Sequence, residues 1–94
     1  MTTLVWSAGF VRRLKRKLRR NPELKVEVEQ TLIQLADDPF HASLKSHKLS
    51  GKLAGIWACS VAYDLRILFE FTQNPDTKEQ EIFLLTIGSH DEVY

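Results

Sequence analysis

The chain has 94 residues, 44% of them hydrophobic and 27% charged, which is ordinary for one soluble globular domain. No apolar run approaches the roughly 18 residues that a membrane-spanning helix needs, and one cysteine, Cys59, excludes an internal disulfide and a cysteine-rich metal site. The N-terminal sequence lacks a basic leader followed by a full-length apolar region. We therefore expect no secretory signal, no membrane association and a cytoplasmic protein.

The charge is polarised along the chain. Residues 1–22 contain seven Lys or Arg residues and no acid, whereas residues 23–94 contain six Lys or Arg residues and twelve Asp or Glu residues. The net charge of +1 therefore conceals a basic and an acidic segment. Such asymmetry indicates a polyanionic or acidic partner, although a dense basic run can also be the solvated face of a helix.

The first predicted elements are a strand over residues 3–6 and a helix that begins after Ser7, a suitable N-cap. Phe10, Leu14 and Leu18 repeat every four residues and predict one narrow apolar stripe on this helix. The rest of its surface is a broad basic face, formed by Arg12, Arg13, Lys15, Arg16, Lys17, Arg19 and Arg20.

The second predicted helix follows Asn21-Pro22-Glu23, which combines a cap residue, a proline for the first helical position and an acid for the first turn. It is expected to run to about Ala36 and to end before Pro39, because the residue before a proline avoids helical geometry. Its expected apolar face contains Leu24, Val28, Leu32 and Leu35, with Ile33 near it.

Residues 47–71 predict a β-hairpin with a turn at about Tyr63-Asp64. Arg66 has the opposite parity to the apolar residues, so it is expected on the other face of the sheet. A mid-strand arginine there indicates a binding partner. The apolar residues that alternate with a period of two are Trp57, Cys59, Val61, Leu65, Ile67, Phe69 and Phe71.

A last strand is predicted over residues 81–87, with Phe83, Leu85 and Ile87 on one face. The order strand, helix, helix and three strands indicates one α+β domain over residues 1–94. Two N-terminal helices are expected to pack on one face of a mainly antiparallel four-stranded sheet, in the order β-α-α-β-β-β.

Cations and proton carriers surround the hairpin and the C-terminus. RNA cleavage without a metal needs a base for the 2′-hydroxyl, an acid for the leaving 5′-oxygen and cations for the phosphate. We see no phosphate loop, zinc-ligand spacing or nucleophile elbow, so no cofactor or metal is expected. Cys59 has core parity, which indicates an inert thiol. The candidate residues are Lys45, His47, Lys48, Lys52, Asp64, Arg66, His90 and Tyr94.

Three stretches together resemble the RelE/ParE superfamily of type II toxins: VWSAGFVRRLKRK, HKLSGKLAGIWACSVAYDLRILFEF and LLTIGSHDEVY. The resemblance covers nearly the whole chain and is nearest to the RelE and YafQ branch of mRNA interferases. It implies a small domain that cuts mRNA in the ribosomal A site without a metal. It also implies a cognate antitoxin that wraps around the toxin in a hetero-oligomer.

The resemblance also implies a role for individual residues. Arg66 matches the phosphate-binding arginine of RelE-like toxins, and His47 matches the catalytic histidine of an H-x-L-x-G segment. Asp64, His90 and Tyr94 match an aspartate, a C-terminal acid or base and the final aromatic residue of YafQ-like toxins. Taken on chemistry alone, Asp64 is expected to be a turn former rather than a catalytic residue. The residues expected to contact RNA are Lys45, Lys48, Lys52, Arg12, Arg13, Lys15, Arg16 and Arg19.

Three positions depart from the YafQ-like pattern. Ser60 replaces a second histidine, Leu65 a tryptophan and Thr86 an arginine. One hypothesis is a ribosome-dependent mRNA endoribonuclease, which the retained proton carriers favour. The others are a ParE-like inhibitor of DNA gyrase and a catalytically degenerate module that only binds its antitoxin. Because these classes share a fold, the fold does not separate them.

Overall fold

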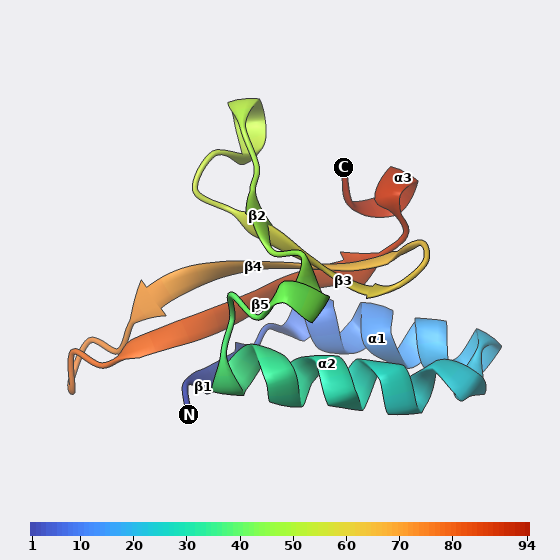
Figure 1. Ribbon diagram of the computed structural model, residues 1–94, viewed down its shortest axis with the longest axis horizontal. Helices are drawn as coiled ribbons and strands as arrows, with labels where there is room; N and C mark the ends of the chain where they lie inside the picture. The colour runs from blue at the N-terminus through green and yellow to red at the C-terminus, as the bar shows by residue number, and fades with distance from the viewer.

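The computed structural model describes all 94 residues, which form a layer of two helices packed on one face of a mixed sheet (Figure 1). The five strands have the order β1-β5-β4-β3-β2, and all neighbours are antiparallel except β1 and β5. The elements are β1 (Thr3–Trp6), α1 (Ala8–Arg20), α2 (Lys25–Asp37), β2 (His47–Lys48), β3 (Trp57–Ala62), β4 (Leu65–Gln73), β5 (Gln80–Gly88) and α3 (His90–Val93).

The predicted α+β fold is confirmed, with one more strand than expected. His47 pairs with Ala58 and Lys48 pairs with Trp57, which adds the two-residue strand β2 at one edge of the sheet. A strand this short shows no measurable alternation of apolar residues, so the sequence pattern does not reveal it. None of the helices has the length and apolar character that a membrane-spanning segment requires.

Helix α1 forms as its cap and stripe predict, whereas the predicted start of α2 is wrong: Pro22–Leu24 is a 3₁₀ turn, the Asn21 side chain makes no capping hydrogen bond, and α2 begins at Lys25. The Ser7 hydroxyl accepts a hydrogen bond from the Phe10 N–H at 3.0 Å, and Phe10 and Leu14 are buried against the sheet. On α2, however, the expectation for Ile33 is wrong, since its side chain is 62% exposed. Consecutive residues lie about 100° apart on a helix, which turns Ile33 outward when Leu32 faces the core.

The hairpin of β3 and β4 has the predicted turn and the predicted buried face. Cys59, Ile67 and Phe69 are fully buried, while Trp57 and Phe71 lie at the margin of the core. The main core thus lies between this face of the sheet and the two helices, which contact β5 and β3.

The predicted inward face of β5 is wrong for Phe83 and Leu85. The buried residues are instead Ile82, Leu84 and Ile87. The cause is a bulge opposite β4: Leu68 pairs with Thr86 and Phe69 pairs with Leu84, which leaves Leu85 as an extra residue. Two core residues of β5 are consequently three positions apart instead of two.

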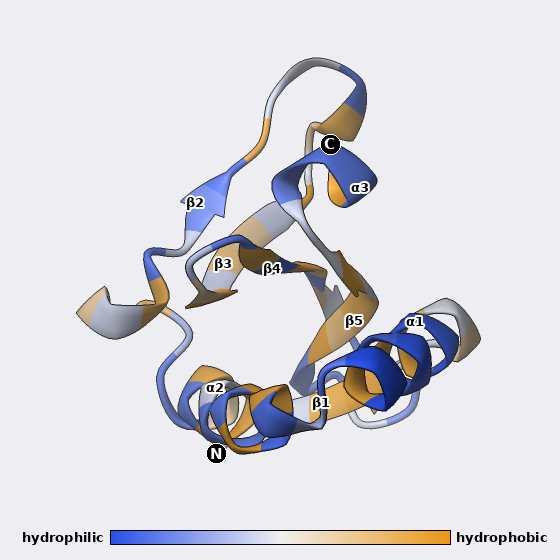
Figure 2. Ribbon diagram, turned by 90° about the vertical axis from the view of Figure 1, so that its right-hand side faces the viewer, coloured by the Kyte–Doolittle hydropathy of each residue, from blue (hydrophilic) through white to orange (hydrophobic).

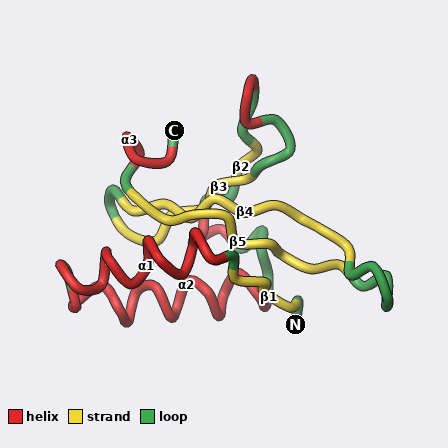
Figure 3. Tube along the Cα trace, turned by 180° about the vertical axis from the view of Figure 1, so that it is seen from behind, coloured by secondary structure: helices red, strands yellow, loops and turns green.

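The second face of the sheet is partly covered. The segment around β2 and the short helix α3 both project from this face, opposite α1 and α2 (Figures 1 and 3). Contacts of α3 with β4 and β5 place it over the sheet, and Leu68 on this face is only 4% exposed. The proposed proton carriers are therefore on the side of the sheet away from the long helices.

Candidate active site

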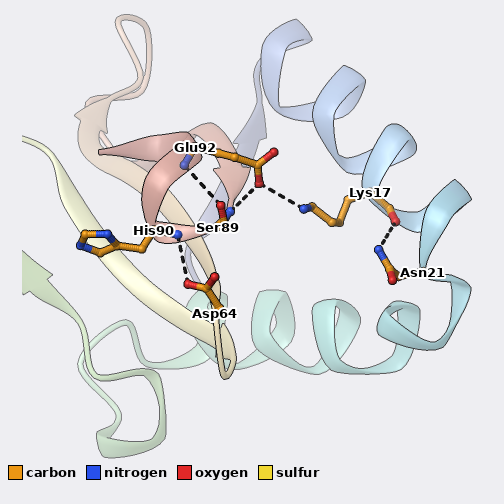
Figure 4. Close-up of polar contacts among 6 residues, drawn as sticks. All are labelled: Lys17, Asn21, Asp64, Ser89, His90 and Glu92. Carbon is orange, nitrogen blue, oxygen red and sulfur yellow. Dashed lines mark hydrogen bonds and ion pairs between the residues drawn. The ribbon is translucent and has the colours of Figure 1, made fainter.

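Four of the five residues predicted to be catalytic gather where the β3–β4 turn meets the end of β5. Strand register places Arg66 beside Gly88, the last residue of β5. The chain then turns through Ser89 into α3. The His90 backbone N–H donates a hydrogen bond to Asp64 Oδ1 at 3.2 Å, which joins α3 to the hairpin turn (Figure 4).

His90 and Tyr94 are stacked edge to face at the C-terminus. Their ring centroids are 4.5 Å apart, and the Tyr94 N–H donates to the His90 carbonyl oxygen at 3.1 Å. The His90 side chain is 64% exposed and is therefore accessible to a ligand. Burial raises the pKa of the Tyr94 hydroxyl, and the charge of Arg66 opposes this rise. The hydroxyl is consequently a neutral hydrogen-bond donor at neutral pH.

The Arg66 guanidinium supports the hairpin turn with one nitrogen. Its Nη1 donates to the carbonyl oxygens of Ala62 at 3.2 Å, Tyr63 at 3.3 Å and Leu65 at 3.4 Å. The Nε and Nη2 groups make no hydrogen bond within the chain, so they are free to donate to an anion. Arg66 lines a cavity of about 410 Å³ together with Ser43, Lys45, Ser60, Val61, Ala62 and Tyr63.

His47 lies on the same face of the sheet but apart from this group. Its partner Ala58 pairs in turn with Leu68, so His47 is two strands away from β4, about 10 Å at normal strand spacing. The His47 Nδ1 lies 3.0 Å from the Lys45 carbonyl oxygen. Since a carbonyl only accepts, Nδ1 is the donor in this contact, and in the neutral imidazole the other nitrogen, Nε2, is an acceptor.

The predicted RNA-binding lysines occupy different surroundings. Lys45 is one of the residues that line the cavity beside Arg66, and Lys52 is exposed in the 3₁₀ turn Gly51–Leu53 that follows β2. Lys48 pairs with Trp57, and its ammonium lies 5.6 Å from the centre of that ring. Because neighbouring residues of a strand face opposite sides, Lys48 points away from the face that carries His47.

The basic face of α1 forms a separate surface. Figure 2 shows α1 as predominantly hydrophilic beside the apolar residues of β5. Its outer side borders a groove of about 520 Å³, across the sheet from α3. The residues that line this groove are Ala8, Val11, Arg12, Lys15, Arg16 and Arg19.

The three departures from the YafQ-like pattern have distinct environments. Ser60 is the cross-strand partner of Arg66, so the absent second histidine would have adjoined the arginine. Leu65 is buried in the core. Thr86 has a buried hydroxyl with no hydrogen-bond partner, and its neighbour on β4 is Leu68.

Cys59 is fully buried, as predicted. Burial raises the pKa of its thiol to about 12, so the nucleophilic thiolate is suppressed. No three His, Cys, Asp or Glu side chains converge closely enough to hold a metal ion.

Sequence reasoning missed three residues that fix α3. Lys17 was grouped only with the basic face of α1, yet its ammonium pairs with Glu92 at 3.1 Å. Ser89 and Glu92 form a capping box at the start of α3. A serine followed three positions later by glutamate is a recognised helix-start signal, so this part of the site could have been predicted.

Comparison with known proteins agrees with this architecture. Residues 2–94 match the family model described as the bacterial toxin of type II toxin–antitoxin systems, YafQ. No curated protein sequence matches the chain. In the complex of DinJ and YafQ from E. coli, one chain has 16% identity and a TM-score of 0.77, with 100% of this chain and 99% of that chain covered.

Two further solved structures have the same fold. A YoeB/ParE toxin from Agrobacterium tumefaciens shares 18% identity with a TM-score of 0.76, covering 95% of this chain and 99% of that one. A metal-bound toxin from Helicobacter pylori shares 25% identity with a TM-score of 0.71, covering 100% of both chains. Since the family model spans all but the first residue, the chain belongs to the YafQ family of bacterial toxins of type II toxin–antitoxin systems.

Proposed function

We propose that the protein is a toxin that cleaves mRNA on the ribosome, with its own side chains performing the proton transfers. The observation that supports this most is the convergence of Asp64, Arg66, His90 and Tyr94 from the hairpin and the C-terminus. An inhibitor that only binds gyrase needs an interface but no grouped acid, base and phosphate ligand. The grouping therefore favours an endoribonuclease over a ParE-like binder.

The proposed reaction uses the 2′-hydroxyl of the RNA as the nucleophile. A histidine takes its proton as the 2′-oxygen attacks phosphorus, and a second histidine protonates the 5′-oxygen as the P–O5′ bond breaks. His47, with Nε2 free to accept, and His90, exposed on α3, are assigned these two tasks. Each histidine must come within hydrogen-bond reach of the oxygen it serves in the RNA complex, directly or through one water.

The remaining residues stabilise charge and position the substrate. Arg66 offers two free donor groups for the phosphate oxygens, whose negative charge increases in the transition state. Lys52 is assigned to the same phosphate and Lys45 to the adjoining backbone. Tyr94 donates its neutral hydroxyl or packs against a base, as aromatic side chains do with unstacked RNA. Asp64 fixes His90 through its backbone N–H.

The proposed partners follow from the family and from the charge distribution. The YafQ of E. coli forms a complex with DinJ, and we infer that this chain likewise binds a cognate antitoxin in a hetero-oligomer. We assign ribosomal RNA to the five outer cations of α1, because multiple Lys and Arg contacts to phosphates supply affinity without sequence recognition. These cations are Arg12, Arg13, Lys15, Arg16 and Arg19.

The direct test is cleavage of ribosome-bound mRNA with an exposed A-site codon. The wild type is expected to give defined 5′ ends at that codon. His90→Ala is expected to lower the cleavage rate by about 10²- to 10⁴-fold, the usual contribution of a general acid or base. Wild-type protein that leaves the mRNA intact but blocks supercoiling by purified gyrase would replace this proposal with the ParE-like alternative.

A further inference from the structure

The position of α3 depends on contacts made outside the helix. It contains four residues, His90–Val93, and a single turn is not stable in isolation because helix nucleation is unfavourable. Yet α3 begins with His90 and is followed directly by Tyr94, two of the proposed catalytic residues. Whatever fixes this turn therefore also fixes the proposed proton carrier.

The first restraint is a reciprocal pair of hydrogen bonds at the start of α3. Glu92 Oε1 accepts from the Ser89 N–H at 2.7 Å, and Ser89 Oγ accepts from the Glu92 N–H at 3.3 Å. This capping box closes the turn between β5 and α3.

The second restraint ties the same carboxylate to a distant helix. Lys17 Nζ donates to Glu92 Oε1 at 3.1 Å, across 75 positions of sequence (Figure 4). Lys17 lies one turn beyond Leu14, which is buried against the sheet, so the lysine projects from a well-anchored helix. The Ser89 N–H and the Lys17 ammonium lower the pKa of Glu92 to about 2.

The third feature is Gly88, whose lack of a side chain lets α3 pack closely against the end of β5. A Cβ at this position would lie 3.0 Å from Glu92 Cβ and 3.1 Å from Val93 Cγ1. On the opposite side of the turn, Asp64 accepts from the His90 N–H. The turn that carries His90 is thus fixed from the hairpin on one side and from α1 on the other.

We propose that Lys17, Ser89 and Glu92 form a terminal clamp whose role is to position His90 and Tyr94 for catalysis. These three are positioning residues, since none of them is assigned a contact with the substrate. The proposal rests on the proposed ribonuclease activity. It also separates Lys17 from the other cations of α1. Arg13, Arg16 and Arg20 line the same small cavity, but only Lys17 forms an ion pair with Glu92.

The experiment measures amide hydrogen exchange and cleavage kinetics on the same full-length variants. Glu92→Gln retains an acceptor for the capping box but loses the charge that pairs with Lys17, and Lys17→Ala removes the other partner. Each is expected to accelerate exchange at the His90 and Tyr94 amides by about three-fold, the scale of a partly exposed ion pair. Glu92→Ala also loses the half of the capping box that the Glu92 carboxylate makes, and is expected to accelerate exchange by about ten-fold.

The kinetic expectation is a lower kcat with an unchanged KM, because the clamp positions catalytic residues and is assigned no contact with the substrate. At saturating ribosomes, kcat falls in Lys17→Ala and Glu92→Gln in step with the loss of amide protection, and Lys17→Arg restores both. The matched control is Lys25→Ala/Glu29→Gln, which removes an exposed lysine–glutamate pair of α2, 4.0 Å apart, without touching α3. It is expected to change neither quantity.

Three results bear on the proposal differently. Unchanged exchange at His90 and Tyr94 in Glu92→Ala would overturn the clamp itself. Faster exchange with an unchanged kcat would overturn its positioning role. If the wild type cleaves no RNA, the proposed function fails, while the exchange data still determine whether Lys17, Ser89 and Glu92 hold α3.

Discussion

Arg66 serves the fold and the proposed chemistry with different nitrogens. Nη1 is occupied by three carbonyl oxygens of the hairpin turn, while Nε and Nη2 remain free beside the cavity. A lysine has one ammonium group in place of the planar guanidinium. It can therefore contact either the turn carbonyls or an anion, but it cannot hold both at once as arginine can. The residue-level prediction therefore distinguishes charge from shape.

Arg66→Ala is expected to lower the free energy of unfolding by about 1 kcal/mol, given that the side chain is only half-buried. It should lower the cleavage rate by about 100-fold or more, as loss of a preorganised charge does. Arg66→Lys should recover part of the rate through its charge. Urea denaturation and single-turnover cleavage measure the two effects, with Lys78→Ala, in the exposed loop between β4 and β5, as a control for lost positive charge. A cleavage rate of Arg66→Ala equal to that of the wild type would show that Arg66 is not part of the active site.

Core positions on β5 offer a second residue-level prediction, which tests the bulge. Leu84→Ala removes a fully buried side chain and is expected to cost about 2–5 kcal/mol of unfolding free energy. Leu85→Ala, at the extra residue of the bulge, should cost about 1 kcal/mol or less. Urea denaturation of the two variants compares them directly. A larger loss for Leu85→Ala would indicate the regular register that the sequence pattern predicts.

Elements with long, regular patterns were predicted well, and those that depend on distant partners were not. The stripe of α1 and the alternation of the hairpin determine buried faces locally, so Phe10 and Ile67 lie where expected. The bulge at Leu85 depends on pairing with β4, and β2 is too short to have a pattern. The contact of Lys17 with Glu92 joins residues 75 positions apart, so no local rule reveals it.

The short helix α3 carries an element-level prediction about pH. Because the folded-state pKa of Glu92 is lowered to about 2 from an ordinary value of 4.5, its stabilising contacts are fully present above about pH 4.5. They are lost as the pH falls from there toward about 2. Carbon NMR of the Glu92 carboxyl should show this low titration. The amide shifts of Ser89 and His90 should move with it, and Glu92→Gln should abolish the movement. Titration of the Glu92 carboxyl near 4.5 would contradict the contacts.

At the scale of the whole molecule, the fold puts the proposed ribosome-binding surface and the proposed catalytic group on opposite sides of the sheet. The basic face of α1 lies on the helical side of the sheet, and the proposed catalytic group lies on the other side (Figures 1 and 2). Phosphate contacts on α1 should therefore set affinity for the ribosome, while residues of the hairpin and α3 set the cleavage rate. Lys17 is the contact that joins these two regions.

This separation predicts how salt acts. If the five outer cations of α1 each contact one phosphate, the logarithm of ribosome affinity should fall with the logarithm of salt concentration with a slope of about −4 to −5. Arg12→Ala/Arg16→Ala should reduce the magnitude of this slope by about 2, since two released counterions are lost. His90→Ala should leave the slope unchanged because His90 lies across the sheet and is assigned to the chemical step. Sedimentation with ribosomes between 50 and 200 mM salt measures the three slopes.

Equal slopes for the wild type and the double variant would show that another surface binds the ribosome. The loop that contains Lys45 and Lys52 is the remaining cationic candidate for that surface.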